Sequence, residues 1–445
     1  MNRKFIGLSF TVLLGLTGGL NLVNLDIHAS DVPRASVVNS GKSDCYSQKF
    51  TKQQVIEDID YILDVISRYH VSAVNGIPEE VRTQKEIEIH NLAENVSIVE
   101  EWRIIYGIIS KFHDAHTRIQ APPLYKRVPF DISVENSKFI CKTGDFEGYE
   151  VIAIDDNSIP DIYEEFKKHF PHEIDEWVYG HFFWSYKKFI PEWSLALAGI
   201  DTSKPVKVTF KKDGDVKSLE VSLSEIEDPF PVQPPYVSYE IDEKNKLGIF
   251  TLNCCQYDDF YRRTVDKFFE DVATKDVKNI VVDLRKNGGG TSNVTAYFAS
   301  YIKNIPTYKT CSYDIRRGNT LEHVKSITYK ESDIQKFKSN KNLFDGGIFI
   351  ATSYRTFSSA LLFAEEFSDN NLATIVGEVP GTSPVHYGHL VDETFELPNS
   401  KLHFWTTFKR WYRVDESKNP ERLIPDVEVP AKDAINKIYE ILKLN

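Results

Sequence analysis

Residues 280–290 read Ile-Val-Val-Asp-Leu-Arg-Lys-Asn-Gly-Gly-Gly, and the fold of the second half of the chain follows from them. The first part is apolar enough for a buried strand, and the last part is a polar turn with three glycines. Glycine lacks a Cβ, so the backbone of such a turn can approach a ligand closely and adopt φ > 0. Its N–H groups can then point together at an anionic oxygen, which makes this turn a candidate site for chemistry.

A second strand–turn–helix junction runs from Gly347 to Ala364 and carries serines in its turn. A hydroxyl there would stand near the positive end of the helix dipole, which suits a nucleophile. The other interpretation is that Ser358 or Ser359 only caps the helix.

Strands and helices alternate around both junctions. We expect strands at 247–252, 280–284, 348–351 and 373–376, and helices at 260–272, 293–302 and 359–367. This order predicts an α/β domain with a largely parallel sheet. Ligand sites in such sheets lie beyond the carboxyl ends of the strands, where both polar turns fall.

The composition is that of an ordinary globular protein. The chain has 445 residues and a net charge of −12, which disfavours nucleic-acid binding. Its five cysteines fit neither a disulfide scaffold nor a regularly spaced zinc site. The sequence therefore predicts no metal and no cofactor.

The N-terminus has the pattern of a targeting segment. Asn2-Arg3-Lys4 precedes an apolar run from Phe5 to Val23, which predicts a signal peptide within residues 1–30 and export to an extracytoplasmic or secreted location. The run is long, so an uncleaved membrane anchor is the alternative.

Three regions follow the leader. Residues 47–122 show helical periodicity and predict an N-terminal helical subdomain, and residues 127–226 contain short β-rich pieces that weakly resemble a PDZ-like module. A proline-rich linker at 228–235 then leads into a catalytic domain at 236–445. The stretch from Trp177 to Trp193 is dense in aromatic residues, which is typical of a core and, as an alternative, of a substrate groove.

Four sets of residues resemble one family, the C-terminal-processing (tail-specific) serine peptidases with their tricorn-core and retinoid-binding-protein-like branch. These are His113-Asp114-Ala115-His116-Thr117; Val282-Asp283-Leu284-Arg285-Lys286-Asn287-Gly288-Gly289-Gly290; Thr356-Phe357-Ser358-Ser359-Ala360; and the later landmarks at 376–378, 397–400 and 424–427. The resemblance extends from about Val55 to Val429. The resemblance implies that the catalytic domain has the layered α/β superhelical fold of the crotonase and Clp-protease type.

The resemblance also implies roles. Ser358 matches the nucleophile, and the amides of Ser359 and of Gly288 or Gly289 match the oxyanion hole. No lysine lies between Ser358 and Lys401, so the Ser–Lys mechanism of one branch does not fit.

The His-base branch fits better, and His116 matches its base. Imidazole has an ordinary pKa near about 6.5, which suits a general base at neutral pH. His386 and His389 are possible substitutes. Ala115 replaces a serine of that branch, so one supporting hydroxyl is missing. Glu421 is the best match to the acidic member, with Asp415 and Glu416 as rivals.

These expectations give an exported serine endopeptidase that hydrolyses peptide bonds in a protein or peptide substrate through an acyl-enzyme. The alternative is a catalytically inactive protein that binds a peptide or an apolar ligand on the same fold.

Overall fold

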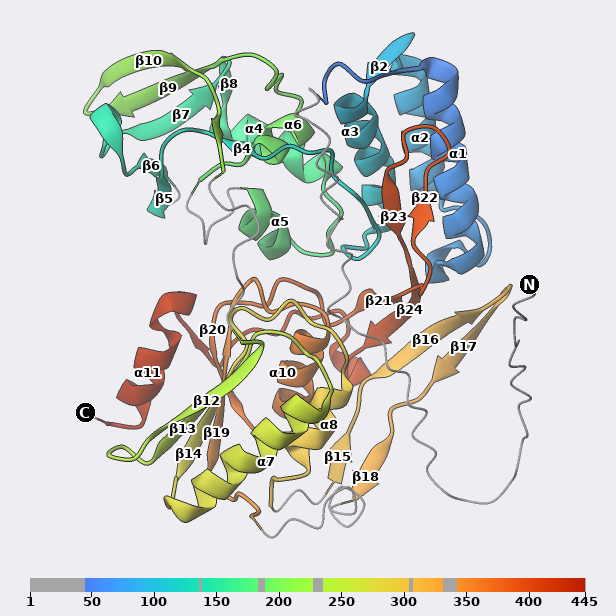
Figure 1. The fold of residues 1–445 in the computed structure, drawn as a ribbon. Helices are drawn as coiled ribbons and strands as arrows, with labels where there is room; N and C mark the ends of the chain where they lie inside the picture. Colours follow the sequence, from blue (N-terminus) through green and yellow to red (C-terminus); the bar gives the residue numbers. More distant parts are fainter. Residues whose placement is uncertain are drawn as a thin grey trace, which may run out of the picture.

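The computed structural model describes residues 45–135, 138–182, 189–226, 235–303, 307–330 and 342–444. The predicted signal peptide, most of the predicted linker and positions 183–188 of the aromatic stretch lie outside the described residues. Figure 1 shows the α/β half of the chain in the lower part of the molecule, with the N-terminal helices and the β-rich region above it.

The lower half is built on one mixed sheet. Its strands are β12 (Val237–Asp242), β13 (Leu247–Leu252), β14 (Asn279–Asp283), β19 (Gly347–Thr352), β20 (Thr374–Gly377) and β25 (Val427–Glu428). They pair in the order β12-β13-β14-β19-β20-β25. Only the β12–β13 pair is antiparallel, so the predicted parallel sheet is confirmed.

The predicted helices of this half are also present. They are α7 (Asp259–Thr274), α8 (Asn293–Ala299) and α10 (Ser359–Asp369), and α11 (Ala434–Ile441) follows near the C-terminus. The apolar run in β14 is buried on both faces because neighbouring side chains alternate. Ile280 and Val282 join the core with α7, α8 and α10, whereas Val281 joins the core with α11.

The upper half combines helices and short strands. The N-terminal helices are α1 (Lys52–Tyr69), α2 (Glu79–Asn91) and α3 (Ile98–Ile109). The β-rich region contains β5 (Ile132–Glu135), β6 (Lys138–Cys141), β7 (Glu150–Ile154), β8 (Asn157–Ser158), β9 (Val206–Lys212) and β10 (Asp215–Val221), with helices α4 (Ile159–His169), α5 (Asp175–Phe182) and α6 (Glu192–Leu197). Thr51 and Ser97 form capping boxes that fix the starts of α1 and α3.

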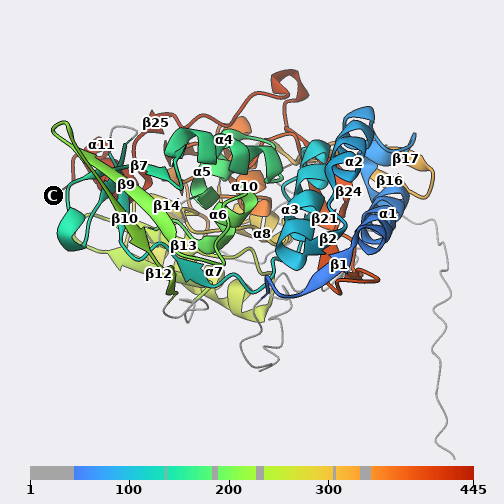
Figure 2. The ribbon, with the colours of Figure 1, turned by 90° about the horizontal axis from the view of Figure 1, so that it is seen from above.

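One hydrophobic core runs through both parts of the upper half. It joins residues of α1 and α3, such as Ile62 and Trp102, to residues of the β-rich region, such as Phe166 and Phe210. Figure 2 shows the two parts side by side from above. The core also includes Phe395 and Phe404, so part of the segment that we assigned to the catalytic domain packs with the N-terminal helices instead.

The remaining strands form smaller sheets, and some of them join segments that are distant in sequence. They are β1 (Lys49–Thr51), β2 (Asn95–Ser97), β3 (Arg118–Ile119), β4 (Lys126–Arg127), β11 (Ser224–Glu225), β15 (Thr307–Lys309), β16 (Ser312–Arg317), β17 (Thr320–Val324), β18 (Thr328–Lys330), β21 (His386–Leu390), β22 (Phe395–Glu396), β23 (His403–Trp405) and β24 (Thr407–Tyr412). Strand β23 pairs with β3, and β21 pairs with β24. The chain after β20 therefore returns to the N-terminal residues that follow α3.

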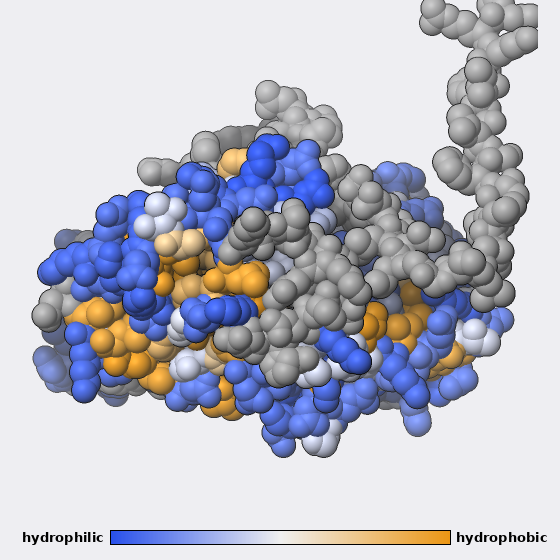
Figure 3. All heavy atoms as spheres, turned by 90° about the horizontal axis from the view of Figure 1, so that it is seen from below, coloured by the Kyte–Doolittle hydropathy of each residue, from blue (hydrophilic) through white to orange (hydrophobic). Residues whose placement is uncertain are grey.

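Figure 3 shows the face seen from below, where hydrophilic residues surround several apolar areas. In the part of the chain that the structure describes, none of the helices has both the length and the apolar character needed to cross a membrane.

Candidate active site

The two polar turns lie side by side because β14 and β19 are parallel neighbours, with Asp283 opposite Ala351. Hydrogen bonds then tie one turn to the other. The Phe357 N–H donates to the Asn287 carbonyl at 3.0 Å, and the Thr356 hydroxyl donates to the Leu284 carbonyl at 2.9 Å. The predicted convergence of the two junctions follows from this register.

Ser358 occupies a strained position at the start of α10. Its φ is 54° and its ψ is −127°, in a region of backbone space that costs a non-glycine residue roughly 1–3 kcal/mol. Its side chain makes no capping hydrogen bond, so the hydroxyl does not serve as the helix cap. The Ser359 hydroxyl is engaged elsewhere, since it donates to the Gly290 carbonyl at 2.6 Å.

The glycine turn lies directly against Ser358. Gly289 has φ +100°, and a Cβ added to it would lie 2.7 Å from the Ser358 Cβ and 3.1 Å from the Ser359 nitrogen. The Gly289 N–H is already used, because it donates to the Asn287 side chain at 2.8 Å. Gly288 is exposed, and its N–H has no hydrogen-bond partner among the described residues. Of the two glycines predicted as alternative oxyanion donors, Gly288 is therefore the one whose N–H is open to a ligand.

Asn287 holds this turn in place. It is buried, and its Nδ2 donates to the Leu252 carbonyl at 2.9 Å while its Oδ1 accepts from Gly289. The side chain thus connects the end of β13 to the glycine turn. Asn287 is part of the glycine-turn motif, but the sequence alone did not indicate this role.

His116 reaches the same region from the segment after α3. Its ring centroid lies 4.5 Å from that of Phe357, the residue before Ser358. Both ring nitrogens lack a hydrogen-bond partner among the described residues, so no hydrogen bond joins the ring to the Ser358 hydroxyl. His116 Nδ1 lies 3.7 Å from Asp114 Oδ1, which leaves Nε2 available on the other side of the ring.

Asp114 is fully buried beside His116 and accepts hydrogen bonds from several sides. The donors are the His116 N–H at 2.8 Å, the Thr117 hydroxyl at 2.6 Å, the Thr407 hydroxyl at 2.8 Å and His70 Nε2 at 3.2 Å. Burial raises the pKa of the Asp114 carboxyl, but hydrogen bonds and positive charge from His116 and His70 outweigh it. They hold that pKa well below its ordinary value. Asp114 is therefore ionised at neutral pH.

A second carboxyl group, Glu173, approaches from the loop between α4 and α5. Its Oε1 accepts from the Ala115 N–H at 3.1 Å. Burial, reinforced by the charge of Asp114, raises the pKa of Glu173 well above its ordinary value. Ligand-type atoms of Asp114, His116 and Glu173 lie within 4.8 Å of one another, a convergence of potential metal ligands that the sequence did not predict.

The two substitute histidines are both near the site but differ in environment. The ring of His386 stacks at 5.9 Å from that of His116, and its Nδ1–H donates to the Ser383 carbonyl at 2.8 Å. Burial and then His116 lower the pKa of His386 to about 3. His389 lines the cleft described below, and burial and then Lys409 lower its pKa to about 4. Both rings are neutral at pH 7.

Glu421, the predicted acidic residue, has an exposed side chain. Its described hydrogen bonds are backbone ones, with Lys418 and with the guanidinium of Arg413. Its rivals also have other partners, since Asp415 caps a short helix and Glu416 accepts from Ser312. By contrast, Asp114 lies beside His116, and its position two residues earlier was the available sequence signal.

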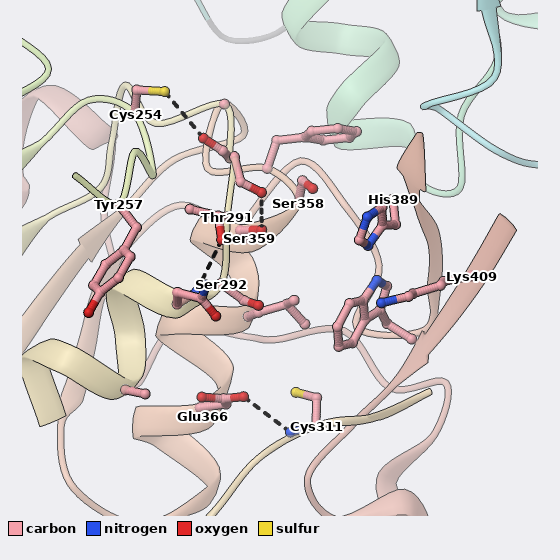
Figure 4. Close-up of a pocket in the computed structure, with 18 of the residues that line it drawn as sticks. Cys254, Tyr257, Thr291, Ser292, Cys311, Ser358, Ser359, Glu366, His389 and Lys409 are labelled. Atoms are coloured by element: carbon pink, nitrogen blue, oxygen red, sulfur yellow. Dashed lines mark hydrogen bonds between the residues drawn. The ribbon is translucent and has the colours of Figure 1, made fainter. Parts of the chain in front are cut away.

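A cleft of about 1770 Å³ joins these groups. Ser358, His116, Gly288, Gly289 and Ser359 all line it, and Glu421 does not. Figure 4 shows Ser358 and Ser359 on one side of the pocket and His389 and Lys409 on another, with Cys311 and Glu366 farther along. The cleft thus brings together five of the six predicted site residues.

The β-rich region also contributes to the cleft. Trp177 of α5 lines it and stacks on Phe357 with ring centroids 4.0 Å apart. Gly180, one turn later, lies so close to Tyr354 that an added Cβ would clash with that ring. Helix α5 therefore supports the nucleophile turn, a contact that no sequence pattern indicated.

Comparison with known proteins agrees with this geometry. Residues 252–429 match the model of peptidase family S41. Mature CPAF shares 11% identity at a TM-score of 0.59, over 88% of this chain and 96% of that chain. Its complex with lactacystin gives 10% identity, a TM-score of 0.58 and coverages of 88% and 97%.

The likeness to CPAF shows a shared fold. The photosystem II D1 C-terminal processing protease has 13% identity and a TM-score of 0.41, over 88% of this chain and 96% of that chain. The mixed helix and sheet architecture, the family match and the motifs agree with one another. The match places residues 252–429 in peptidase family S41, and it supports a serine-type peptidase.

Proposed function

We propose that the protein is an endopeptidase in which Ser358 attacks the peptide carbonyl and His116 is the general base. The observation that carries this proposal is the meeting of Ser358, His116 and the glycine turn in one cleft. The strained backbone of Ser358 and its uncommitted hydroxyl support the role of nucleophile.

The proton would move through His116. In the attack step, the Ser358 Oγ forms a bond to the carbonyl carbon while its proton passes to His116 Nε2. The imidazolium then protonates the leaving amine as the peptide bond breaks, which leaves an acyl-enzyme. A water molecule repeats the sequence and releases the acid. The ring must approach Ser358 more closely for this step, as catalytic groups often do when substrate binds.

We assign the acidic supporting role to Asp114 in place of Glu421. Its ionised, buried carboxylate lies on the Nδ1 side of His116, where it would orient the ring and stabilise the imidazolium. Four donors hold the carboxylate itself in place. Burial raises the pKa of Glu173 and so favours its uncharged form, whereas the pKa of Asp114 is lowered, so we assign the charge beside the base to Asp114.

The oxyanion would bind between the N–H groups of Gly288 and Ser359. Each fixed donor of this kind lowers the barrier by roughly 3–4 kcal/mol in a site that excludes water. The N–H of Ser359 belongs to the first turn of α10, where backbone donors lack helical partners. The role of Gly289 is then to let the turn approach Ser358 closely.

The substrate would be a protein or peptide outside the cytoplasm. The leader sequence at 1–30 supports export, either with cleavage or as an anchor. The family supports a polypeptide substrate.

Fluorophosphonate labelling tests the proposal. Such a probe phosphonylates an activated serine, so we expect labelling of the full chain at neutral pH and its loss in Ser358→Ala and His116→Ala. His403→Ala is the matched control, because His403 lies on β23 and pairs with Glu396 on the surface side of the strand. Peptide hydrolysis should follow the same pattern.

The competing hypothesis is a catalytically inactive binding protein. The lack of a hydrogen bond to either ring nitrogen of His116 within the described residues is the observation that favours it. Well-folded protein that takes up no fluorophosphonate between pH 6 and 9 would support this alternative.

A further inference from the structure

Three cationic side chains that line the cleft form no ion pair with a carboxylate of the described residues: the exposed Arg263 and the partly buried Arg118 and Lys409. Arg118 and Lys409 both line it, and neither forms an ion pair within 4.0 Å with a carboxylate of the described residues. Such isolation is unexpected in a chain with a net charge of −12. Most other cations of the described chain that are partly buried, such as Arg285 and Arg413, hold a carboxylate.

Three of the four carboxylates that line the same cleft already have partners. Asp259 pairs with Arg262, and Asp266 accepts hydrogen bonds from Tyr297 and Tyr301. Glu366 accepts from Tyr308 and from the Cys311 N–H. Asp392 is exposed to solvent. Apart from the exposed Asp392, the charged groups that line the cleft and have no described partner are therefore cationic.

The surroundings of Lys409 are those of a recognition site. Its Nζ lies 4.4 Å from the ring centroid of Tyr313 and 5.4 Å from that of Trp411. Aromatic faces stabilise a cation without neutralising it, so the ammonium group still attracts an anion. Figure 4 shows the amino group in the pocket next to His389.

The groups around Lys409 do not neutralise the charge of its ammonium group. Burial and then Arg317 lower the pKa of Lys409 to about 8, so it is mostly protonated at neutral pH. His389 is uncharged there, as described above. Arg118 extends the positive character of the cleft, and its guanidinium lies 5.7 Å from the ring centroid of Trp405.

We propose that Lys409, with its wall of Tyr313 and Trp411, is a subsite that binds a carboxylate of the peptide substrate. The assignment deepens the proposed peptidase function and rests on it. A carboxylate on an acidic side chain and the free carboxylate of a C-terminus share this chemistry. An incoming carboxylate would gain a charge-assisted hydrogen bond to a partly desolvated ammonium. Binding of a carboxylate at Lys409 would not require any side chain of the cleft to change its protonation state or to break an ion pair.

Four peptide libraries test the proposal. All are acetylated heptapeptides whose flanking residues are random but exclude Asp and Glu; the central residue is fixed as Glu or Gln, and each set is made with a C-terminal acid or amide. Cleavage is followed by mass spectrometry. Binding to the Ser358→Ala variant is followed by tryptophan fluorescence, because Trp405 and Trp411 flank the two cations.

We expect carboxylate-bearing libraries to be cleaved and bound about 10- to 100-fold better than the Gln-amide library, as one charge-assisted hydrogen bond implies. In Lys409→Gln the preference should fall to within about threefold. Lys437→Gln is the control, since Lys437 lies on α11 and pairs with Glu440. Better cleavage and binding of the Glu-amide library than of the Gln-amide library would show that the subsite binds a side-chain carboxylate. Better cleavage and binding of the Gln-acid library would show that it binds the C-terminal carboxylate.

Equal cleavage and equal binding of all four libraries by the unsubstituted enzyme would overturn the proposal. So would a preference that survives in Lys409→Gln. If Lys409→Gln does not fold, the preference of the unsubstituted enzyme must weaken between about 50 and 500 mM salt, as a charge interaction does; a constant preference refutes it. If no library is cleaved, the binding measurements still test whether Lys409 binds a carboxylate. The lack of cleavage then counts against Ser358 as the nucleophile.

Discussion

Substitution of Gly289 by alanine tests how closely the glycine turn must approach the nucleophile. The new Cβ would lie 2.7 Å from the Ser358 Cβ, about 0.7 Å closer than the 3.4 Å at which ordinary contact begins. It would also lie 2.9 Å from the Phe357 carbonyl oxygen, which belongs to the backbone and cannot rotate away. The φ of +100° adds a strain of roughly 1–2 kcal/mol for alanine.

The expected losses of labelling rate and of stability in Gly289→Ala follow from these contacts. The Ser358 turn must move by several tenths of an ångström, and a misplacement of about 1 Å at a reacting group costs about 100-fold in rate. We expect Gly289→Ala to slow fluorophosphonate labelling by about 10- to 100-fold. Its free energy of unfolding should fall by about 2–5 kcal/mol, from the backbone strain and the overpacking together.

Gly76→Ala is the matched control for this experiment. Gly76 has φ +103°, and an added Cβ there meets no atom within 4 Å. It should therefore lose only the roughly 1–2 kcal/mol of backbone strain and label at the rate of the unsubstituted protein. Normal labelling of Gly289→Ala, or equal slowing of both variants, would refute the reasoning.

Four further predictions follow from the site. Asp114→Asn should lower the rate of acylation by about 10³-fold or more, measured in single-turnover experiments, because the charge beside the base is lost. Glu421→Gln should change that rate by less than about twofold, since its side chain is exposed. The pKa of Asp114 is depressed in the folded state, so its contribution to stability is present above about pH 3.8 and disappears as the pH falls below it. In chemical unfolding between pH 2 and 5, the free energy of unfolding of Asp114→Asn should fall less steeply as the pH is lowered. An unchanged slope would contradict the assignment. Trp177→Ala should reduce stability by about 1–3 kcal/mol and slow labelling, because it removes the ring stacked on Phe357.

Much of the α/β half could be predicted from sequence because its signals are local. The apolar run in β14 and the glycines after it specify a buried strand and a tight turn. The alternation of strands and helices then fixes a parallel sheet, which brings Gly288 and Ser358 to the same edge. These are properties of neighbouring residues and of chain order.

The supporting contacts could not be predicted because they join residues that are distant in sequence. Thr407 donates to Asp114 although the two are 293 positions apart, and Trp177 contacts Phe357 from the β-rich region. The exposure of Glu421 was hidden for the same reason, since a carboxylate in a loop sequence carries no sign of where it points. Asp114 is the exception, because its place beside His116 was visible in the motif.

The upper half shows how a shared core can cross a boundary drawn from sequence. Periodicity separates the helices of residues 47–122 from the strands that follow, yet Trp102 and Phe166 belong to one core. Phe395 and Phe404 join them from the last quarter of the chain. Through this core and through α5, the N-terminal residues and the β-rich region can both influence the position of His116 relative to Ser358.

A crystal structure of the fluorophosphonate adduct tests the central claim most directly. The account predicts phosphorus bonded to the Ser358 Oγ, with the phosphonyl oxygen about 2.7–3.1 Å from the N atoms of Gly288 and Ser359. It also predicts His116 Nε2 within hydrogen-bond reach of the serine oxygen and Asp114 on the other side of the ring. An adduct on another residue, or a phosphonyl oxygen that faces solvent away from the glycine turn, would contradict it.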